Sequence, residues 1–422
     1  MHRPRKPAPA EPGGRPPPKG ARGATGRRAA IERYIATSRH RLNAGELGSV
    51  PVFLGLAAIW IVFQALNSQF LSARNLSNIS VDMVGTGMIA VGIVFVLLLG
   101  EIDLSVGSVS GLAAAAFAVL NVNHGIGEGT AALIAILVGT AAGAVQGFFF
   151  ARVGVPSFVV TLAGLLGWNG LMLYILGSTG TINLNDEGLV AALTSFYFDN
   201  VAVAYALAAV GTGAYFLVSY HDSRRRRGMG LRSRPLGEIV LHTAMLAVVA
   251  VAAAYVLNRF QGLPLALLIF LVVVVGLQSV LRRTLYGRGI YAVGGGVEAA
   301  RKAGLNVTWV RISVFMISGT MAAVGGLFFA SRVASASQTS GSGNLLINAI
   351  AAAVIGGTSL FGGRGSTWSA LLGALVIQSI ASGVALLGIQ TAAEFMITGG
   401  VLLLAVVVDS LSRRAQKAHG RI

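Results

Sequence analysis

Two carboxylates lie almost side by side in the segment GEIDLSVGSVSG, residues 100–111, between two strongly apolar stretches. Only Ile102 separates Glu101 from Asp103. A carboxylate deep in hydrocarbon costs about 2.5–3.5 kcal/mol or more, so the pair needs an interface, a water-filled cavity or polar partners. The simpler interpretation is a tight polar turn in which Asp103 or Ser105 caps the next helix. The other is a broken helix whose free backbone groups line a solute path.

A second candidate is the basic segment 282–311, RRTLYGRGIYAVGGGVEAARKAGLNVTWVR. Its three consecutive glycines, Gly294 to Gly296, precede a short helical pattern from Val297 to Ala303, which Gly304 closes as a C-terminal cap. A glycine-rich turn before a helix is typical of phosphate sites, but the sequence has no GxxxxGK[ST] motif, so we do not expect this chain to hydrolyse ATP. The segment is either a solvated loop that only orients the chain or a short helix on which a partner docks.

A third candidate is the segment 348–379, where glycine pairs at 356–357 and 362–363 bracket Thr358 and Ser359. It weakly repeats the order seen in 89–112, which is an apolar helix, a glycine-bounded polar turn and a helix of small residues. The two segments therefore indicate an internal repeat.

No catalytic constellation is visible. The chain has no cysteine and its six histidines are scattered, so we expect no catalytic residue, no metal site and no cofactor bound by this chain. Nearly every carboxylate lies at the edge of an apolar stretch, whereas carriers driven by ion gradients place ionisable groups inside their spans. These observations predict that energy comes from another subunit.

The elements that must position these residues are membrane-spanning helices. The chain is 55% hydrophobic and 11% charged, with mean hydropathy +0.74, against about 25% charged in a soluble domain. Uncharged windows of at least ~20 residues recur, long enough to cross the bilayer as helices. We predict an all-α polytopic membrane protein with about twelve spans, within a range of ten to fourteen. The predicted spans are 50–67, 81–99, 104–121, 130–150, 157–177, 201–219, 239–258, 263–281, 309–330, 345–361, 367–388 and 393–410.

The basic residues orient these spans. With the N-terminus in the cytoplasm, 28 of the 32 Lys and Arg fall in cytoplasmic segments and three in outer loops. Both termini are then cytoplasmic, in a multi-pass membrane protein. The net charge of +17 does not indicate nucleic-acid binding, because helices without charge leave the basic loops to dominate.

Composition divides the chain into three parts. Residues 1–48 form a basic tail rich in Pro, Gly and Ala that should be disordered, 49–411 the transmembrane domain, and 412–422 a basic cytoplasmic tail. Within the transmembrane domain, Gly139, Gly143 and Gly147 mark one helix face, and Gly107 with Gly111 repeats the spacing, so both faces favour close helix packing.

Four motifs together resemble the permease subunits of bacterial ABC importers for monosaccharides, the ribose, xylose and arabinose group. They are GEIDLSVGS (100–108), ARVGVPSFVVTL (151–162), YAVGGGVEAARKAGLNV (291–307) and AIAAAVIGGTSLFGGRGS (349–366), and the xylose-type members look most similar. One departure is that many members carry carboxylates just before AIAA, where this chain has Leu346, Ile347 and Asn348.

The resemblance implies a second permease copy, a cytoplasmic sugar-import ATPase with two nucleotide-binding domains that carries the ATP, an extracytoplasmic sugar-binding protein, a monosaccharide substrate and surrounding membrane lipids. It makes the loop 282–308 the ATPase-coupling loop, with Gly294, Gly295, Glu298, Ala299, Ala300 and Gly304 as its residues. From position alone we expect the translocation path to be lined by Asp103, Ser105, Asn169, Asn348 and Gln378. The rival interpretations are a self-powered sugar carrier driven by protons or Na⁺ and, less favoured, a membrane-embedded enzyme.

Overall fold

A computed structural model describes residues 50–231 and 233–418 of the chain. The tail 1–48 that we predicted to be disordered lies outside the described residues. One large unit comprises Gly48–Asp409, and the described residues of a second unit, from Ser410 onward, continue the last helix.

Apolar windows without proline or strand alternation fold as helices, and short polar segments separate them. The helices are α2 (Val50–Leu66), α3 (Ala73–Leu98), α4 (Val106–Ala118), α5 (Glu128–Phe148), α6 (Ser157–Leu176), α7 (Leu189–Ser195), α8 (Val201–Gly228), α9 (Leu236–Asn258), α10 (Leu265–Arg283), α11 (Leu285–Gly295), α12 (Val297–Lys302), α13 (Val307–Val333), α14 (Leu345–Ile355), α15 (Thr367–Leu386) and α16 (Thr391–Ala418). Wider π-type turns extend α4 over Val119–Asn123 and α5 over Phe149–Val153.

Each of the twelve predicted spans contains a helix. Ten helices in the described part of the chain are long and apolar enough to cross a membrane, and the apolar helices Pro51–Leu66 and Leu345–Ile355 are shorter. With 11 residues, α14 rises roughly 16 Å, about half the hydrocarbon thickness. The chain is therefore a helical, multi-pass membrane protein.

Helix ends differ from the predicted span ends where polar residues continue the helix. α3 begins at Ala73 rather than at residue 81, because Ser72 caps it by accepting from the Asn75 amide at 3.3 Å. α8 runs on through its arginines to Gly228, since arginine is a good helix former. Hydropathy marks where lipid begins, whereas the helix itself ends at a cap.

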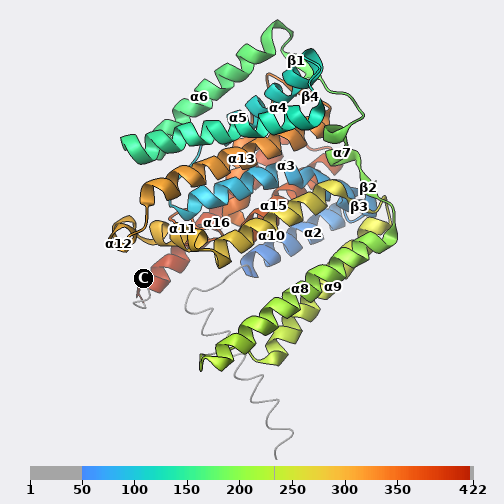
Figure 1. Ribbon diagram of the computed structural model, residues 1–422. Helices are drawn as coiled ribbons and strands as arrows, with labels where there is room; N and C mark the ends of the chain where they lie inside the picture. Colours follow the sequence, from blue (N-terminus) through green and yellow to red (C-terminus); the bar gives the residue numbers. More distant parts are fainter. Residues whose placement is uncertain (1–49, 232, 419–422) are drawn as a thin grey trace, which may run out of the picture. The chain divides into compact units, whose positions relative to one another are not determined.

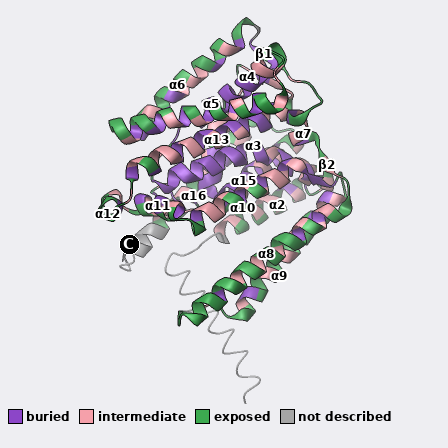
Figure 2. Cartoon of the chain, in the orientation of Figure 1, coloured by how far each residue is buried: buried purple, intermediate pink, exposed green. Residues whose placement is uncertain are grey.

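The core is built around α3, which contacts α13, α15, α14 and α10. Its apolar window is 94% buried, against 11% for α8 and for α9. Figure 2 shows the same contrast between the buried centre and the exposed α8–α9 hairpin. α3 and α9 are equally apolar, so apolarity does not explain the difference. Gly85, Gly87 and Gly92 let neighbouring side chains and backbone approach α3 closely, which favours its central place.

The glycine face predicted on α5 is a real contact. Added Cβ atoms at Gly139, Gly143 and Gly147 would lie 2.1–2.8 Å from atoms of α13, so the two helix backbones touch along this face. The second predicted face, Gly107 and Gly111 on α4, meets the non-helical backbone of Ser340 and Gly341 instead of another helix.

The sequence did not predict two small strand pairs. β1 (Thr181–Asn183) pairs antiparallel with β4 (Ser335–Ser337), and β2 (Tyr197–Phe198) with β3 (Leu263–Pro264). Figure 1 shows these strands at one end of the helices, with α11 and α12 at the opposite end. Pairs of two or three residues are too short to leave an alternating pattern, so they were missed.

Candidate functional site

The first helix interruption buries a carboxylate. α3 ends at Leu98, α4 begins at Val106, and between them Asp103 is 3% exposed. Its Oδ1 accepts hydrogen bonds from the Ser105 amide at 2.9 Å and the Ser105 hydroxyl at 2.6 Å, and its Oδ2 accepts from the Ser318 hydroxyl of α13 at 2.8 Å. No basic residue within the described ranges forms an ion pair with it. Three donors therefore compensate for its burial.

The interruption is not a simple capped turn. Ser105 is the N-cap of α4, but its side chain makes no capping hydrogen bond and binds Asp103 instead. The amide of Gln146 on α5 donates to the Ser105 hydroxyl at 2.7 Å and is itself 2% exposed. Sequence reasoning missed Gln146 and Ser318. The available signal was an isolated polar residue in an otherwise apolar span.

Glu101 makes a separate contact at the edge of this network. Its Oε2 accepts from the Ser157 hydroxyl at the start of α6 at 2.6 Å, and its Oε1 lies 4.0 Å from Arg311 of α13. The Arg311 guanidinium also stacks 4.6 Å from the ring centre of Phe150. The two neighbouring carboxylates thus fasten the interruption to α13 at two separate residues, and Glu101 also fastens it to α6.

The glycine-rich segment folds as two short helices, α11 and α12. The helix expected over 297–303 is present as α12, and Gly304 follows it with φ +82°, the left-handed conformation that glycine favours. Glu298 and Ala299 are exposed, and Ala300 packs into the protein with 3% exposure. Glu298 pairs with Arg301 at 3.2 Å across one turn. α12 thus exposes the side that carries Glu298, while the side that carries Ala300 is fixed against the protein.

α11 packs against the first interruption and against the turn between α14 and α15 through Gly100, Gly294, Gly362 and Gly363, which we call the glycine junction. A Cβ at Gly294 would lie 1.7 Å from the Leu98 carbonyl oxygen and 2.8 Å from the Gly363 nitrogen. A Cβ at Gly362 would meet the Gly294 oxygen at 2.8 Å and the Gly100 nitrogen at 3.0 Å. The Gly363 amide donates to the Leu98 carbonyl at 2.9 Å. Backbones from three distant parts of the chain meet here without intervening side chains.

Tyr291 adds a side-chain link at the same place. Its hydroxyl donates to the Gly365 carbonyl at 2.8 Å. Burial raises the pKa of Tyr291 above its usual value, while Arg282 partly lowers it, so the hydroxyl stays protonated and keeps donating. α11 is thereby joined to the segment that precedes α15.

The second interruption follows β4. Residues 338–344, QTSGSGN, are not helical and come back against the start of α4, where Gly341 meets Gly107 and Ser340 meets Gly111. α14 begins directly after them, and several of the segment's polar residues are exposed. Non-helical backbone at membrane depth is tolerated where it is buried in protein or lines a water-filled cavity.

The predicted path residues do not form one cluster in this conformation. Asp103 and Ser105 share one hydrogen-bond network. Asn169 on α6, Asn348 on α14 and Gln378 on α15 are half-buried and stand outside that network. Their part in the path stays a prediction.

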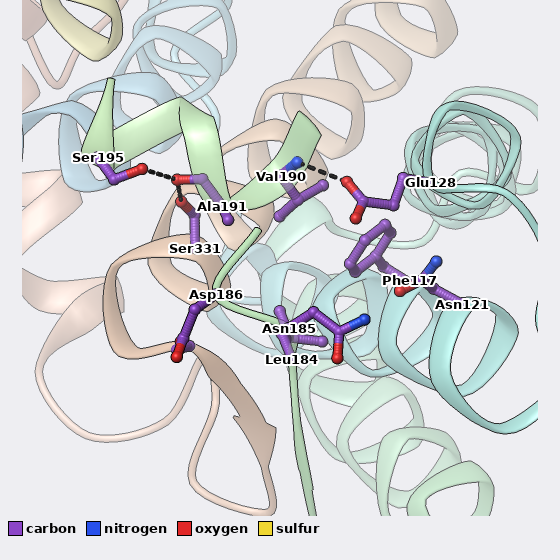
Figure 3. A pocket seen from close by; sticks show the side chains of 11 residues that line it. Phe117, Asn121, Glu128, Leu184, Asn185, Asp186, Val190, Ala191, Ser195 and Ser331 are labelled. Carbon is purple, nitrogen blue, oxygen red and sulfur yellow. Dashed lines mark hydrogen bonds between the residues drawn. The ribbon is translucent and has the colours of Figure 1, made fainter. Parts of the chain in front are cut away.

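A cavity of about 220 Å³ with a mixed polar and apolar lining lies at the strand end of the helices (Figure 3). Glu128, the first residue of α5, accepts from the Val190 amide of α7 at 2.9 Å at its wall. Its lining was not predicted, because it assembles from four separate segments. The lining residues are Phe117, Asn121, Glu128, Leu184, Asn185, Asp186, Val190, Ala191, Ser195, Ser331 and Ala334.

A multi-pass bundle whose interrupted helices bring polar groups and free backbone into its interior is typical of solute transporters. Comparison with known families is more specific. The family model described as branched-chain amino acid transport system / permease component matches residues 75–406, so the chain belongs to this family of transporter permease components.

Curated relatives cover nearly the whole chain. The xylose transport system permease protein XylH of Escherichia coli K12 is 35% identical over 371 residues, which are 87% of this chain and 93% of the relative. The ribose import permease RbsC of Bacillus subtilis is 29% identical, covering 89% and 97%. The L-arabinose ABC transporter permease AraH of Azospirillum brasilense is 30% identical, covering 91% and 94%. No solved structure matches the chain. The resemblance that the motifs indicated is confirmed.

Proposed function

We propose that this chain is the transmembrane permease of an ATP-driven importer for a pentose such as xylose in the bacterial inner membrane. The observation that carries the proposal is the similarity to a xylose permease over 87% of this chain and 93% of the relative. In the proposal two copies form the path, a cytoplasmic ATPase with two nucleotide-binding domains supplies the energy, and an extracytoplasmic protein delivers the sugar.

The coupling loop 282–308 would dock α12 on the ATPase. α12 has the required form, because its Glu298 face is exposed while Ala300 anchors its base. Movement of α12 would reach α11, and the glycine junction would pass it to the first interruption and to the turn between α14 and α15 at once. The backbones touch at the junction with no flexible side chain between them. A displacement of α11 is therefore passed directly to the segments that it contacts.

The path would run beside the second interruption. The exposed polar segment 338–344 and Asn348 at the start of α14 offer the hydroxyl and amide groups that hydrogen-bond a sugar. Asp103 and Ser105 would then stabilise the first interruption, between α3 and α4. Asn169 and Gln378 stay candidates for lining the path. Neutral polar groups suit an uncharged solute.

Sugar uptake in proteoliposomes tests the proposal. The chain is reconstituted with its ATPase and binding protein, and radiolabelled xylose uptake is measured with ATP supplied on the ATPase side. We expect uptake that needs all three proteins and hydrolysable ATP. Leucine serves as a competing solute, because the family description names branched-chain amino acids. Uptake of leucine in place of xylose would contradict the sugar assignment.

The rival of a self-powered carrier rests on Asp103, because a buried carboxylate without a cationic partner is the kind of group that binds a coupling ion. It predicts xylose uptake by the chain alone, abolished by an uncoupler. A Glu298→Arg variant provides a second test, since reversing the charge on the docking face should abolish uptake by the complex and leave a self-powered carrier unaffected.

A further inference from the structure

The arginine cluster after α8 lines a cavity together with the end of α10. In the sequence these arginines counted only toward the orientation of the spans. In the structure a cavity of about 950 Å³ is bounded by the last turns of α8, by Arg234 just before α9 and by the last two residues of α10. Five arginines face it, which are Arg225, Arg226, Arg234, Arg282 and Arg283.

Most of this charge is uncompensated by the protein. Arg226 pairs with Asp222 at 3.0 Å, and Arg282 stacks on the ring of Tyr291 at 5.6 Å. Within residues 50–231 and 233–418, Arg225, Arg234 and Arg283 form no ion pair. Guanidinium groups crowded around one cavity repel each other, and an anion that accepts hydrogen bonds from several of them relieves the repulsion.

The position of the cavity relative to the membrane and the residues that line it favour a lipid over a soluble anion. The arginines follow directly on the apolar parts of α8 and α10, which places them where phospholipid headgroups lie. Leu217 and Val218 of the cavity wall are 55% and 46% exposed and offer an apolar surface to acyl chains. A free phosphate ion would use the arginines and leave this surface unfilled.

The site also lies where the hairpin lacks protein support. α8 and α9 pack on each other, and they meet the rest of the large unit through contacts of α9 with α3 and β3 and of α8 with β2. At the arginine end the hairpin is closed on itself, since the Ser223 hydroxyl donates to the Arg234 carbonyl at 2.7 Å. A ligand shared by Arg225 of α8 and Arg283 of α10 joins this end to the helix that leads into α11.

We propose that this cavity binds the phosphate headgroup of an anionic phospholipid, which tethers the α8–α9 hairpin to α10. The proposal does not depend on which solute the protein carries or on how transport is powered.

Binding of a fluorescent phosphatidylglycerol to the purified full chain in neutral detergent tests it, with fluorescence anisotropy as the readout. The variant Arg225→Gln with Arg283→Gln removes two charges from the cavity. The matched control, Arg224→Gln with Arg227→Gln, removes two charges from α8 that do not line it. We expect the first variant to raise the Kd about tenfold or more and the control to change it less than about threefold.

Three outcomes would overturn the proposal. Equal weakening of phosphatidylglycerol binding in both variants would mean that the lipid is attracted by the overall positive charge of the protein and not by this cavity. Equal affinity for labelled phosphatidylcholine would mean that the site does not recognise an anionic headgroup. Competition by millimolar inorganic phosphate as effective as that by unlabelled phosphatidylglycerol would assign the cavity to a soluble anion. Circular dichroism melting of each variant checks that the helices remain folded.

Discussion

At the scale of single residues, the main finding is that Asp103 acts through partners the sequence did not reveal. The sequence identified Asp103 and Ser105 as a polar pair near an interruption, and the structure places both in one network. It adds Gln146 and Ser318, which lie 41 and 215 residues from their partners in the network. Such distant pairings depend on how α5 and α13 pack, and a local sequence pattern does not predict that packing.

Replacing Asp103 by alanine should destabilise the protein, because the Ser105 amide and the hydroxyls of Ser105 and Ser318 lose their buried acceptor. Leaving buried donors unsatisfied costs about 1–3 kcal/mol. Thermal unfolding in detergent, followed by circular dichroism, should show a lower midpoint. Asp199→Ala, which removes an exposed carboxylate, should leave the midpoint unchanged. Equal midpoints for the two variants would mean that the network contributes nothing to stability.

At the scale of elements, close backbone contact organises the helices. The α5 glycine face was predictable because its residues recur every fourth position on one helix. The glycine junction was not, because Gly100, Gly294 and Gly362 belong to three segments and each was explicable as a local turn. The short α14 was predicted as part of a span over 345–361, and the helix stops at Ile355, where the glycine pair 356–357 begins the polar turn.

Gly143→Val should separate α5 from α13, because a Cβ there would lie 2.1 Å from the Phe315 carbonyl oxygen. Overpacking of this kind costs about 1–3 kcal/mol, occasionally more. The matched control is Gly167→Val on α6, where an added Cβ meets nothing within 4 Å. The measurement is the fraction of monodisperse protein by size-exclusion chromatography after heating, and only Gly143→Val should lower it. If both variants survive heating equally, the α5–α13 contact is not tight.

At the scale of the whole molecule, the sequence predicted class, helix positions and family well, because hydropathy and motifs are local. The distribution of Lys and Arg predicts an orientation with the coupling loop in the cytoplasm, and the strand pairs then face outward. The strand pairs and the cavity beside Glu128 were beyond the sequence, since each joins loops far apart in the chain.

The absence of cysteine makes this orientation directly testable by labelling. Ala299→Cys on α12 should react with a membrane-impermeant maleimide only after the cells are opened. Asp186→Cys, in the exposed loop before α7, should react on intact spheroplasts. Both residues are exposed, so a failure to react would report the side of the membrane and not burial in the protein. The reverse pattern would invert the topology and remove α12 from the ATPase side.

In the proposed mechanism, movement of the ATPase reaches the first interruption and the turn between α14 and α15 through the contact of α11 at Gly294. The most direct test is xylose transported per ATP hydrolysed in the reconstituted complex, comparing Gly294→Ala with Gly295→Ala. The resemblance also places Gly295 in the coupling loop, but a Cβ there meets nothing within 4 Å, so the added methyl group should leave transport as in the wild type. Gly294→Ala should lower the ratio about tenfold, because its Cβ collides with the Leu98 carbonyl.

Tyr291→Phe, which removes only the hydrogen bond to the Gly365 carbonyl, should lower the ratio less and provides a folded comparison should Gly294→Ala prove unstable. The account predicts that the ratio falls in the order Gly295→Ala, Tyr291→Phe, Gly294→Ala. A wild-type ratio in both Gly294→Ala and Tyr291→Phe would contradict it.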